Sequence, residues 1–243
     1  MKIIGHRGAA ALAPENSLAA IQAGLRSGVD AIEIDVRVSN DDVVVLSHDP
    51  VVRITSGPSL LITSTSYNDL VAADSNLTTL ERAIQEINMV VPLMIEVKAG
   101  VPAAPIIDIL QTFLERGWRA DSLLIASKSQ AILRLMHTAL PTLPTMVIEP
   151  WSSLRAIRRA RELNTTHLVM NQRFVWFGFV RAISRRYRLY VYTLNTPGKA
   201  ASWERYGLAG VITDNPPAMA SLKSIASSQL TATSLKQPKI GRH

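Results

Sequence analysis

The order of apolar and polar positions predicts that strands and helices alternate along most of the chain. Short apolar runs of roughly four to eight residues are typical of buried strands, and apolar residues three and four positions apart are typical of helices. From residue 92 onward we expect strands at 92–97, 122–126, 145–148, 167–170, 189–194 and 210–213. The helices expected between and after them are at 103–116, 130–139, 152–163, 174–185, 199–206 and 218–226.

The first ninety residues show the same pattern less regularly. Strands are expected at 1–5, 29–38 and 43–46, and helices at 18–25 and 80–88. In residues 51–78, Ser, Thr and a Gly-Pro pair interrupt the apolar pattern, which predicts a loop excursion with one short helix near 67–73.

These strands and helices predict one (β/α)8 barrel, the TIM fold of the α/β class. Eight strand-helix units in about 225 residues match the usual size of this barrel, and the ninth expected strand would pair outside it. We expect a small insertion after the strand that ends near His48. An open doubly wound sheet is the alternative, but its glycine-rich first turn is missing, because His6-Arg7-Gly8 follows the first strand. The barrel domain is expected at 1–223, and residues 224–243 read as a basic, loosely ordered tail.

Composition narrows the class of protein. With 47% hydrophobic and 19% charged residues, the chain is typical of a compact globular protein. It contains no cysteine, which excludes a disulfide framework, a thiolate nucleophile and cysteine-bound zinc. No apolar run approaches the roughly 20 residues that span a bilayer, so we expect no transmembrane segment and a cytoplasmic location.

The net charge of +7 is unevenly distributed. Residues 151–188 hold nine arginines and one glutamate, whereas the rest of the chain before residue 221 is acidic. Arg155, Arg158 and Arg159 lie at helical spacing with Glu162, which favours one solvated helix face over a surface for anions or membranes. No nucleic-acid-binding motif accompanies these arginines, so no nucleic-acid partner is expected.

Two carboxylates in one strand open the functional argument. Glu33 and Asp35 would point to the same face, roughly 7 Å apart. A buried pair of this kind must share a proton, meet a basic partner or hold a cation. Glu96 ends a later strand, and parallel strands of a barrel end on the same face. Three carboxylates together suit Mg²⁺ or Ca²⁺, and the alternative is that Glu96 pairs with Lys98 or Arg7 inside the barrel.

Two histidines fall at expected strand ends beside these carboxylates. His6 and His48 are candidates for an acid/base pair, in which one removes a proton from the attacking group and the other protonates the departing alkoxide. The alternative is that they only cap or stabilise turns. Arg7 and Lys98 offer positive charge for a phosphate group.

Read together and in order, these motifs resemble the glycerophosphodiester phosphodiesterase family. The resemblance rests on His6-Arg7-Gly8, Pro14-Glu15-Asn16-Ser17, Glu33-Ile34-Asp35-Val36, Ser47-His48-Asp49, Thr79-Leu80-Glu81, Ile95-Glu96-Val97-Lys98, Tyr192-Thr193-Leu194-Asn195 and Gly210-Val211-Ile212-Thr213-Asp214-Asn215-Pro216.

The resemblance implies a TIM-barrel hydrolase of glycerol and lipid metabolism that converts glycerophosphodiesters to glycerol 3-phosphate and an alcohol. It implies one divalent cation, Mg²⁺ or Ca²⁺ with Mn²⁺ as a further candidate, and an insertion after His48. By position, the metal ligands would be Glu33, Asp35 and Glu96. The acid/base pair would be His6 and His48, and the phosphate would contact Arg7 and Lys98.

Three positions depart from the family pattern. Asp42 stands where glycine is usual and needs a left-handed turn, Lys128 replaces a phenylalanine expected in the substrate pocket, and Tyr192 replaces a tryptophan. The last two bear on the substrate. One alternative substrate class is therefore a lysophospholipid cleaved in the manner of phospholipase D, with Trp176, Phe177 and Phe179 as acyl-chain contacts or as packing residues. Another alternative is a barrel that binds phosphate esters without catalysis.

Overall fold

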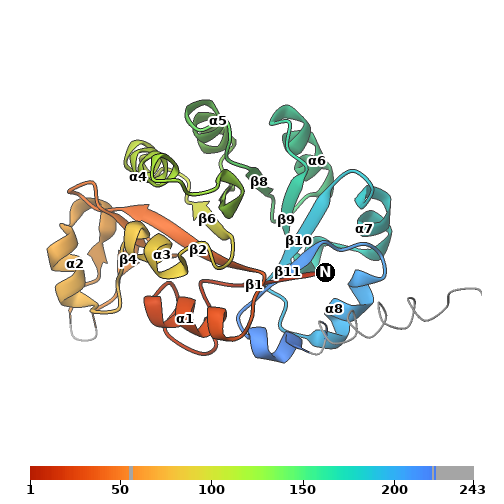
Figure 1. Ribbon diagram of the computed structural model, residues 1–243, viewed down its shortest axis with the longest axis horizontal. Coiled ribbons are helices and arrows are strands. Elements are labelled where there is room, and N and C mark those ends of the chain that lie inside the picture. The colour runs from red at the N-terminus through yellow and green to blue at the C-terminus, as the bar shows by residue number, and fades with distance from the viewer. Residues whose placement is uncertain (55–56, 221, 223–243) are drawn as a thin grey trace, which may run out of the picture.

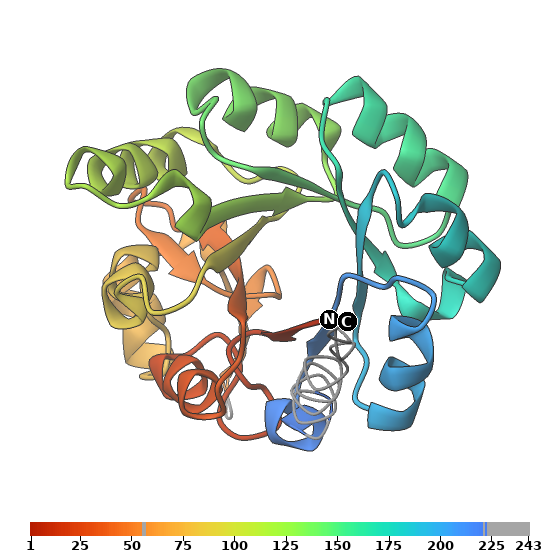
Figure 2. The ribbon, with the colours of Figure 1, turned by 45° about the vertical axis from the view of Figure 1, so that its right-hand side comes forward.

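The computed structural model describes residues 1–54, 57–220 and 222. Within these residues, eight parallel strands close into a barrel because β1 pairs with both β2 and β11 (Figure 2). In barrel order the strands are β1 (Lys2–Gly5), β2 (Ala31–Val38), β6 (Leu93–Val97), β7 (Leu123–Ser127), β8 (Thr145–Ile148), β9 (His167–Asn171), β10 (Arg188–Tyr192) and β11 (Gly210–Thr213). The expected (β/α)8 barrel is confirmed.

Helices surround the strands, as Figure 1 shows. They are α1 (Leu18–Arg26), α3 (Leu80–Ile87), α4 (Ala104–Glu115), α5 (Gln130–Ala139), α6 (Ser153–Glu162), α7 (Phe177–Ile183) and α8 (Pro197–Glu204). Four of them begin after a Ser or Thr whose hydroxyl accepts a hydrogen bond from a backbone N–H of the first turn: Ser17, Thr79, Ser129 and Ser152. These caps satisfy donors that a helix start leaves unpaired, so sequence fixes where these helices begin.

Strand β2 shows how the barrel positions its charged residues. Ile32, Ile34 and Val36 belong to the core between strands and helices, whereas Glu33 and Asp35 alternate with them. A second apolar cluster, inside the barrel, contains Ile4, Ala31, Met94, Ala126, Met146, Ile148, Val169, Tyr190 and Ile212. This cluster fills the interior, and the carboxylates of β2 lie toward the carboxyl ends of the strands.

Of the nine expected strands, the one at 43–46 is the strand that pairs outside the barrel. Strand β3 (Val44–Leu46) pairs antiparallel with the end of β2. Only the short turn around Asp41 and Asp42 joins the two strands, and a parallel partner would need a crossover of a dozen or more residues. Asp42 has a φ of 61°, the left-handed conformation expected of it. His48 therefore follows a hairpin strand.

The insertion starts with this hairpin and lies beside the barrel (Figure 1). It continues with β4 (Val51–Val52), β5 (Leu60–Leu61), the 3-10 helix Ile62–Ser64 and α2 (Tyr67–Ala73). A separate small core of Val45, Val52, Ile62, Leu70 and Leu77 holds it together. The expected excursion after His48 is present, but its first strand precedes His48.

Two helices expected near the end of the chain differ from their predicted form. The helix expected at 174–185 is shorter, because a 3-10 helix (Gln172–Phe174) precedes α7. The helix expected at 218–226 begins as the 3-10 helix Pro216–Met219, and most of that range and the tail at 224–243 lie outside the described residues. In the described ranges, no helix has the length and apolar character that a bilayer crossing requires.

The spacing of the arginines in α6 predicted that they share one solvated face. In the structure they do not. Arg158 is exposed and pairs with Glu162 at 2.9 Å. Arg159 is buried, and its Nη1 donates to the carbonyl of Ile148 at 2.9 Å and lies 3.3 Å from Glu149 Oε2. The buried carboxylate of Glu149 gives Arg159 a partner inside the protein, which spacing along the sequence could not reveal.

Candidate active site

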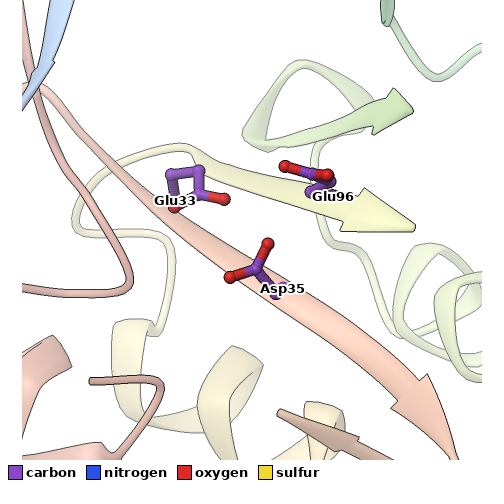
Figure 3. Close-up of side chains that lie close together, drawn as sticks. All are labelled: Glu33, Asp35 and Glu96. Atoms are coloured by element: carbon purple, nitrogen blue, oxygen red, sulfur yellow. The ribbon is translucent and has the colours of Figure 1, made fainter. Parts of the chain in front are cut away.

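Three carboxylates from two neighbouring strands gather at one point. Asp35 of β2 is opposite Glu96 of β6 in the strand register, and Glu33 lies two residues before Asp35. One oxygen from each carboxylate lies within 4.8 Å of the others. Figure 3 shows the three carboxyl groups close together above β2 and β6. The acidic cluster expected from the sequence is therefore assembled.

Positive and amide groups surround Asp35 in particular. Lys98 Nζ contacts Asp35 and lies 2.8 Å from Glu96 Oε1, and Arg7 Nε is 3.2 Å from Asp35 Oδ2. Asn16 Nδ2 donates to the same oxygen at 3.1 Å. Burial acts to raise the pKa of Asp35, but the charge and hydrogen bond of Lys98, with Arg7 and Asn16, outweigh it and lower the pKa. The ion pair between Glu96 and Lys98, the alternative reading of the sequence, is present.

Glu33 has a different environment although it shares the strand with Asp35. Its Oε2 accepts a hydrogen bond from the backbone N–H of Arg7 at 2.9 Å, and His6 Nε2 is 4.0 Å away. Among the described residues, no lysine or arginine forms an ion pair with Glu33. Burial, followed by the charge of Asp35, raises the pKa of Glu33 to about 8. The imidazole of His6 is thus the basic side chain nearest to Glu33 in an ion-pair contact among the described residues.

The donor set fits a hard divalent cation. Carboxylate oxygens are the ligands that Mg²⁺ and Ca²⁺ prefer. Glu96 Oε1 is buried beside the ammonium groups of Lys98 and Lys128, at 2.8 and 3.5 Å, and Glu33 forms no lysine or arginine ion pair within the described part of the chain. The three carboxylates can therefore hold a metal ion.

His6 follows β1 and is fixed by an acidic partner. Its Nδ1 lies 2.5 Å from Asp214 Oδ1, and Asn195 Nδ2 donates to the other oxygen of Asp214 at 2.8 Å. Burial acts to lower the pKa of His6, but the hydrogen bond to Asp214 and the charge of Glu33 outweigh it and raise the pKa. Because Nδ1 is engaged by Asp214, Nε2 is the ring nitrogen nearer Glu33.

His48 reaches the same cavity from the insertion. Its Nδ1 lies 2.9 Å from Asp49 Oδ1, and its carbonyl accepts a hydrogen bond from Arg37 Nη2 at 2.7 Å. A cavity of about 120 Å³ is lined by both histidines, the three carboxylates and Arg7. The two histidines therefore share one cavity with the acidic cluster.

The two expected phosphate contacts occupy different places. Arg7 lines the cavity, although its Nη1 is 2.7 Å from both oxygens of Glu15. Lys98 contacts two carboxylates but is not among the cavity-lining residues. Lys128, which the sequence marked only as a departure, lines the cavity and lies 3.5 Å from Glu96 Oε1.

Several residues complete the site although the sequence predicted no role for them. Asn16 and Asp214 both lie in motifs that carried the family resemblance, so their positions were visible, but their partners were not. Tyr192 lines the cavity in place of tryptophan. Burial, with the charges of Glu96 and Glu149, raises the pKa of Tyr192 to about 12, so its hydroxyl keeps its proton at neutral pH.

Comparison with known proteins agrees with this geometry. YhdW of Bacillus subtilis is 25% identical over 235 residues, which cover 89% of this chain and 95% of YhdW. The human lysophospholipase D GDPD1 is 35% identical over 109 residues, 43% of this chain and 34% of the human protein.

A solved phosphodiesterase from Oleispira antarctica, in complex with its product sn-glycerol-3-phosphate, has the same fold with a TM-score of 0.79. It is 24% identical, and the match covers 92% of this chain and 97% of that one. The model of the glycerophosphoryl diester phosphodiesterase family matches residues 6–218. The chain therefore belongs to the glycerophosphoryl diester phosphodiesterase family and is an enzyme of that family.

Proposed function

We propose that the protein hydrolyses glycerophosphodiesters to glycerol 3-phosphate and an alcohol with the help of one divalent cation. The observation that carries the proposal is the single cavity shared by three carboxylates and two imidazoles. The family match supports the reaction class, and the product bound to the Oleispira antarctica phosphodiesterase supports the substrate class.

Each side chain has a task in this proposal. Glu33, Asp35 and Glu96 hold Mg²⁺ or Ca²⁺, with Mn²⁺ as a further candidate. When bound, the cation offsets the negative charge of the phosphoryl oxygens. Arg7 and Lys98 add positive charge near the phosphate, Arg7 directly at the cavity wall and Lys98 from behind two of the carboxylates.

The two histidines move protons. One imidazole takes the proton from the oxygen that attacks phosphorus, which belongs either to water or to the glycerol hydroxyl of the substrate. As the new phosphorus–oxygen bond forms and the ester bond breaks, the other imidazole gives a proton to the departing alkoxide, which leaves as a neutral alcohol. His6 is oriented by Asp214, and His48 by Asp49. These carboxylates leave Nε2 of each ring for the substrate.

The direct test is release of glycerol 3-phosphate from glycerophosphocholine. We expect release with Mg²⁺, Ca²⁺ or Mn²⁺, loss of activity with a chelator, and recovery when the cation is returned. If no glycerophosphodiester or lysophospholipid is cleaved with any of the three cations, the proposal is wrong and a phosphate-ester-binding barrel without catalysis is favoured.

Substitution of the histidines tests their roles. His6→Ala and His48→Ala are each expected to lower kcat by about 100-fold or more, which is the usual size of a general acid/base effect, without loss of fold. His137→Ala, on the exposed surface of α5, is the matched control and should leave kcat unchanged. Normal kcat in both His6→Ala and His48→Ala would remove the proposed roles.

The cation site has its own test. Glu33→Gln removes one ligand charge, so the concentration of cation at half-maximal activity should rise. Glu115→Gln, on the outer helix α4, is the control. An unchanged cation requirement in Glu33→Gln would contradict the proposed ligand set.

A second candidate activity is cleavage of lysophospholipids in the manner of phospholipase D. The match to the human lysophospholipase D favours it. Of the three aromatic residues suggested for acyl chains, Phe179 is buried and packs against the protein, whereas Trp176 and Phe177 are 63% and 43% exposed, although Phe177 also stacks on Tyr206. The ratio of kcat/KM for lysophosphatidylcholine to that for glycerophosphocholine decides between the two substrates.

A further inference from the structure

Three apolar side chains lie exposed near the carboxyl ends of β8 and β9. Trp151 follows β8, Leu154 is in the first turn of α6, and Phe174 follows β9; their exposed fractions are 62%, 79% and 41%. The rings of Trp151 and Phe174 meet edge to face with centroids 5.2 Å apart. We call these three residues the Trp151 patch. It belongs to the barrel face on which the candidate active site opens, because β8 and β9 both end there.

A basic hollow borders the patch. This cavity of about 390 Å³ is lined by Trp151 itself and by Lys128, Arg155 and Arg159, with Glu149 as the carboxylate among them. Arg155 Nε donates to Glu149 Oε2 at 2.6 Å, and Arg159 Nη2 donates to the carbonyl of Lys128 at 2.9 Å. Two arginines thus share the carboxylate of Glu149, and Lys128 Nζ lies 3.5 Å from Glu96 Oε1. Lys128 also lines the candidate active-site cavity, so the two cavities are neighbours.

The surrounding chain carries the same sign of charge. Residues 151–188 contain nine arginines and a single acidic residue, Glu162. Arg158 and Arg173 are exposed on α6 and on the turn that holds Phe174. Exposed Trp, Phe and Leu side chains beside arginines suit the boundary between lipid headgroups and acyl chains, where rings and apolar tips insert and cations meet lipid phosphates.

We propose that the Trp151 patch and the basic hollow bind the surface of an anionic phospholipid bilayer, with the mouth of the candidate active site turned toward the lipids. The charge argues against a second copy of the chain as occupant, because a two-fold axis through the patch would bring two basic hollows together. Binding of this surface to lipid is independent of which phosphodiester the enzyme cleaves.

Vesicle binding tests the proposal with the full chain. The protein is sedimented with vesicles of phosphatidylcholine alone and of phosphatidylcholine mixed with phosphatidylglycerol, each at low and high salt. We expect binding to the phosphatidylglycerol vesicles, weaker binding at high salt because lipid charge is screened, and little binding to phosphatidylcholine alone.

Substitutions in the patch show whether it makes the contact. Trp151→Ser and Leu154→Ser should each weaken binding roughly tenfold or more, since each removes a large apolar side chain from the lipid. Val90→Ser is the matched control: Val90 is 72% exposed, precedes β6 at the other end of the barrel, and should bind as the wild type does. Melting temperatures confirm that the variants are folded.

Three outcomes would overturn the proposal. One is the absence of binding to phosphatidylglycerol vesicles, and another is binding that Trp151→Ser and Leu154→Ser leave unchanged, which would move the contact elsewhere, for example to the basic residues 224–243. The third is self-association that depends on the patch without vesicle binding, seen by analytical ultracentrifugation. Hydrolysis of water-soluble glycerophosphocholine by Leu154→Ser should equal that of the wild type, which separates this inference from the proposed reaction.

Discussion

Glu33 and Asp35 show how strongly local surroundings decide the character of a side chain. Both are buried on one strand, yet the pKa of Asp35 is lowered and that of Glu33 is raised. Burial by itself acts to raise the pKa of both carboxyl groups. Lys98, Arg7 and Asn16 gather around Asp35, whereas Glu33 receives a backbone N–H and a distant imidazole. The strand pattern predicted that these carboxylates share a face, but the groups that distinguish them come from other segments.

Asp214 contacts His6 Nδ1 at 2.5 Å, and in the proposed function it is the positioning residue for this ring. Asp214→Ala is expected to lower kcat by about 10- to 100-fold, because the ring then loses the partner that fixes its orientation and tautomer. The lowering should appear in kcat at saturating cation, with little change in melting temperature. Asp121→Ala, which removes an exposed ion pair with Arg119, is the control and should keep full activity. Full activity in Asp214→Ala would show that His6 does not need this partner.

Glu149 gives a prediction about stability and pH. Burial acts to raise the pKa of Glu149, but hydrogen bonds from Arg155 and the Trp151 N–H, with Arg159 nearby, outweigh it and lower the pKa. A lowered pKa in the folded state means that the carboxylate stabilises the fold above its unfolded pKa near 4.5 and that this contribution is lost as pH falls through the folded value.

We therefore expect Glu149→Gln to lower the free energy of unfolding at neutral pH by about 1–3 kcal/mol, through weaker hydrogen bonds to the two arginines. Urea unfolding at a series of pH values should show that the difference from the wild type narrows below pH 4.5, where Glu149 itself becomes neutral. A difference that stays constant down to pH 3 would contradict this account.

Among the elements, β3 marks the limit of sequence-based prediction. A run such as Val43-Val44-Val45-Leu46 predicts a buried strand, but its composition is the same for parallel and antiparallel pairing. Turn length carries the missing information, because only a hairpin can close within the few residues between β2 and β3. The barrel strands themselves were predicted well because each is followed by a helix or a turn that separates it from the next.

The same limit applies to contacts between distant segments. His6 and Asp214 are 208 positions apart, and they meet only because β1 and β11 close the barrel side by side. The sequence placed each of these residues at the end of a strand. That they contact one another follows only from closure of the barrel. Glu149 and Arg159 are a similar case, since the spacing of arginines on α6 predicted exposure and the carboxylate at the end of β8 changed it.

The β2–β3 turn offers a test of its backbone. Asp42 has positive φ, which costs a residue with a branched side chain about 1–2 kcal/mol. Asp42→Val should lower the free energy of unfolding in urea by that amount, whereas Asp42→Gly should leave it within about 0.5 kcal/mol, because glycine adopts this conformation freely. Asn40→Val is the control at an exposed position outside the left-handed region. Equal effects of valine at 40 and 42 would contradict the argument.

For the barrel as a whole, the apolar interior supports the charged end. Met94, Ile148, Val169 and Ile212 belong to the interior cluster and also line the candidate active-site cavity. The floor under the carboxylates is therefore apolar, which strengthens the electrostatic contacts above it.

Met146 lies in that interior and is 1% exposed. Met146→Ala should lower the free energy of unfolding by about 2–5 kcal/mol, through lost contacts and the cavity left behind. Leu135→Ala, on an exposed position of α5, is the control and should cost less than about 0.5 kcal/mol. Urea unfolding measures both, and a small loss for Met146→Ala would mean that the interior rearranges to fill the space.

Because β3 lies outside the barrel, the two imidazoles are carried by different parts of the structure. His6 is attached to a strand of the closed barrel, while His48 is carried by a separate unit with its own small core and is tethered to β2 through Arg37. The distance between the two rings therefore depends on how that unit packs against the barrel. In the proposed function, changes in the core of this unit alter the distance between the rings, and with it the size of phosphate ester that fits between them, while the three carboxylates keep their positions on β2 and β6.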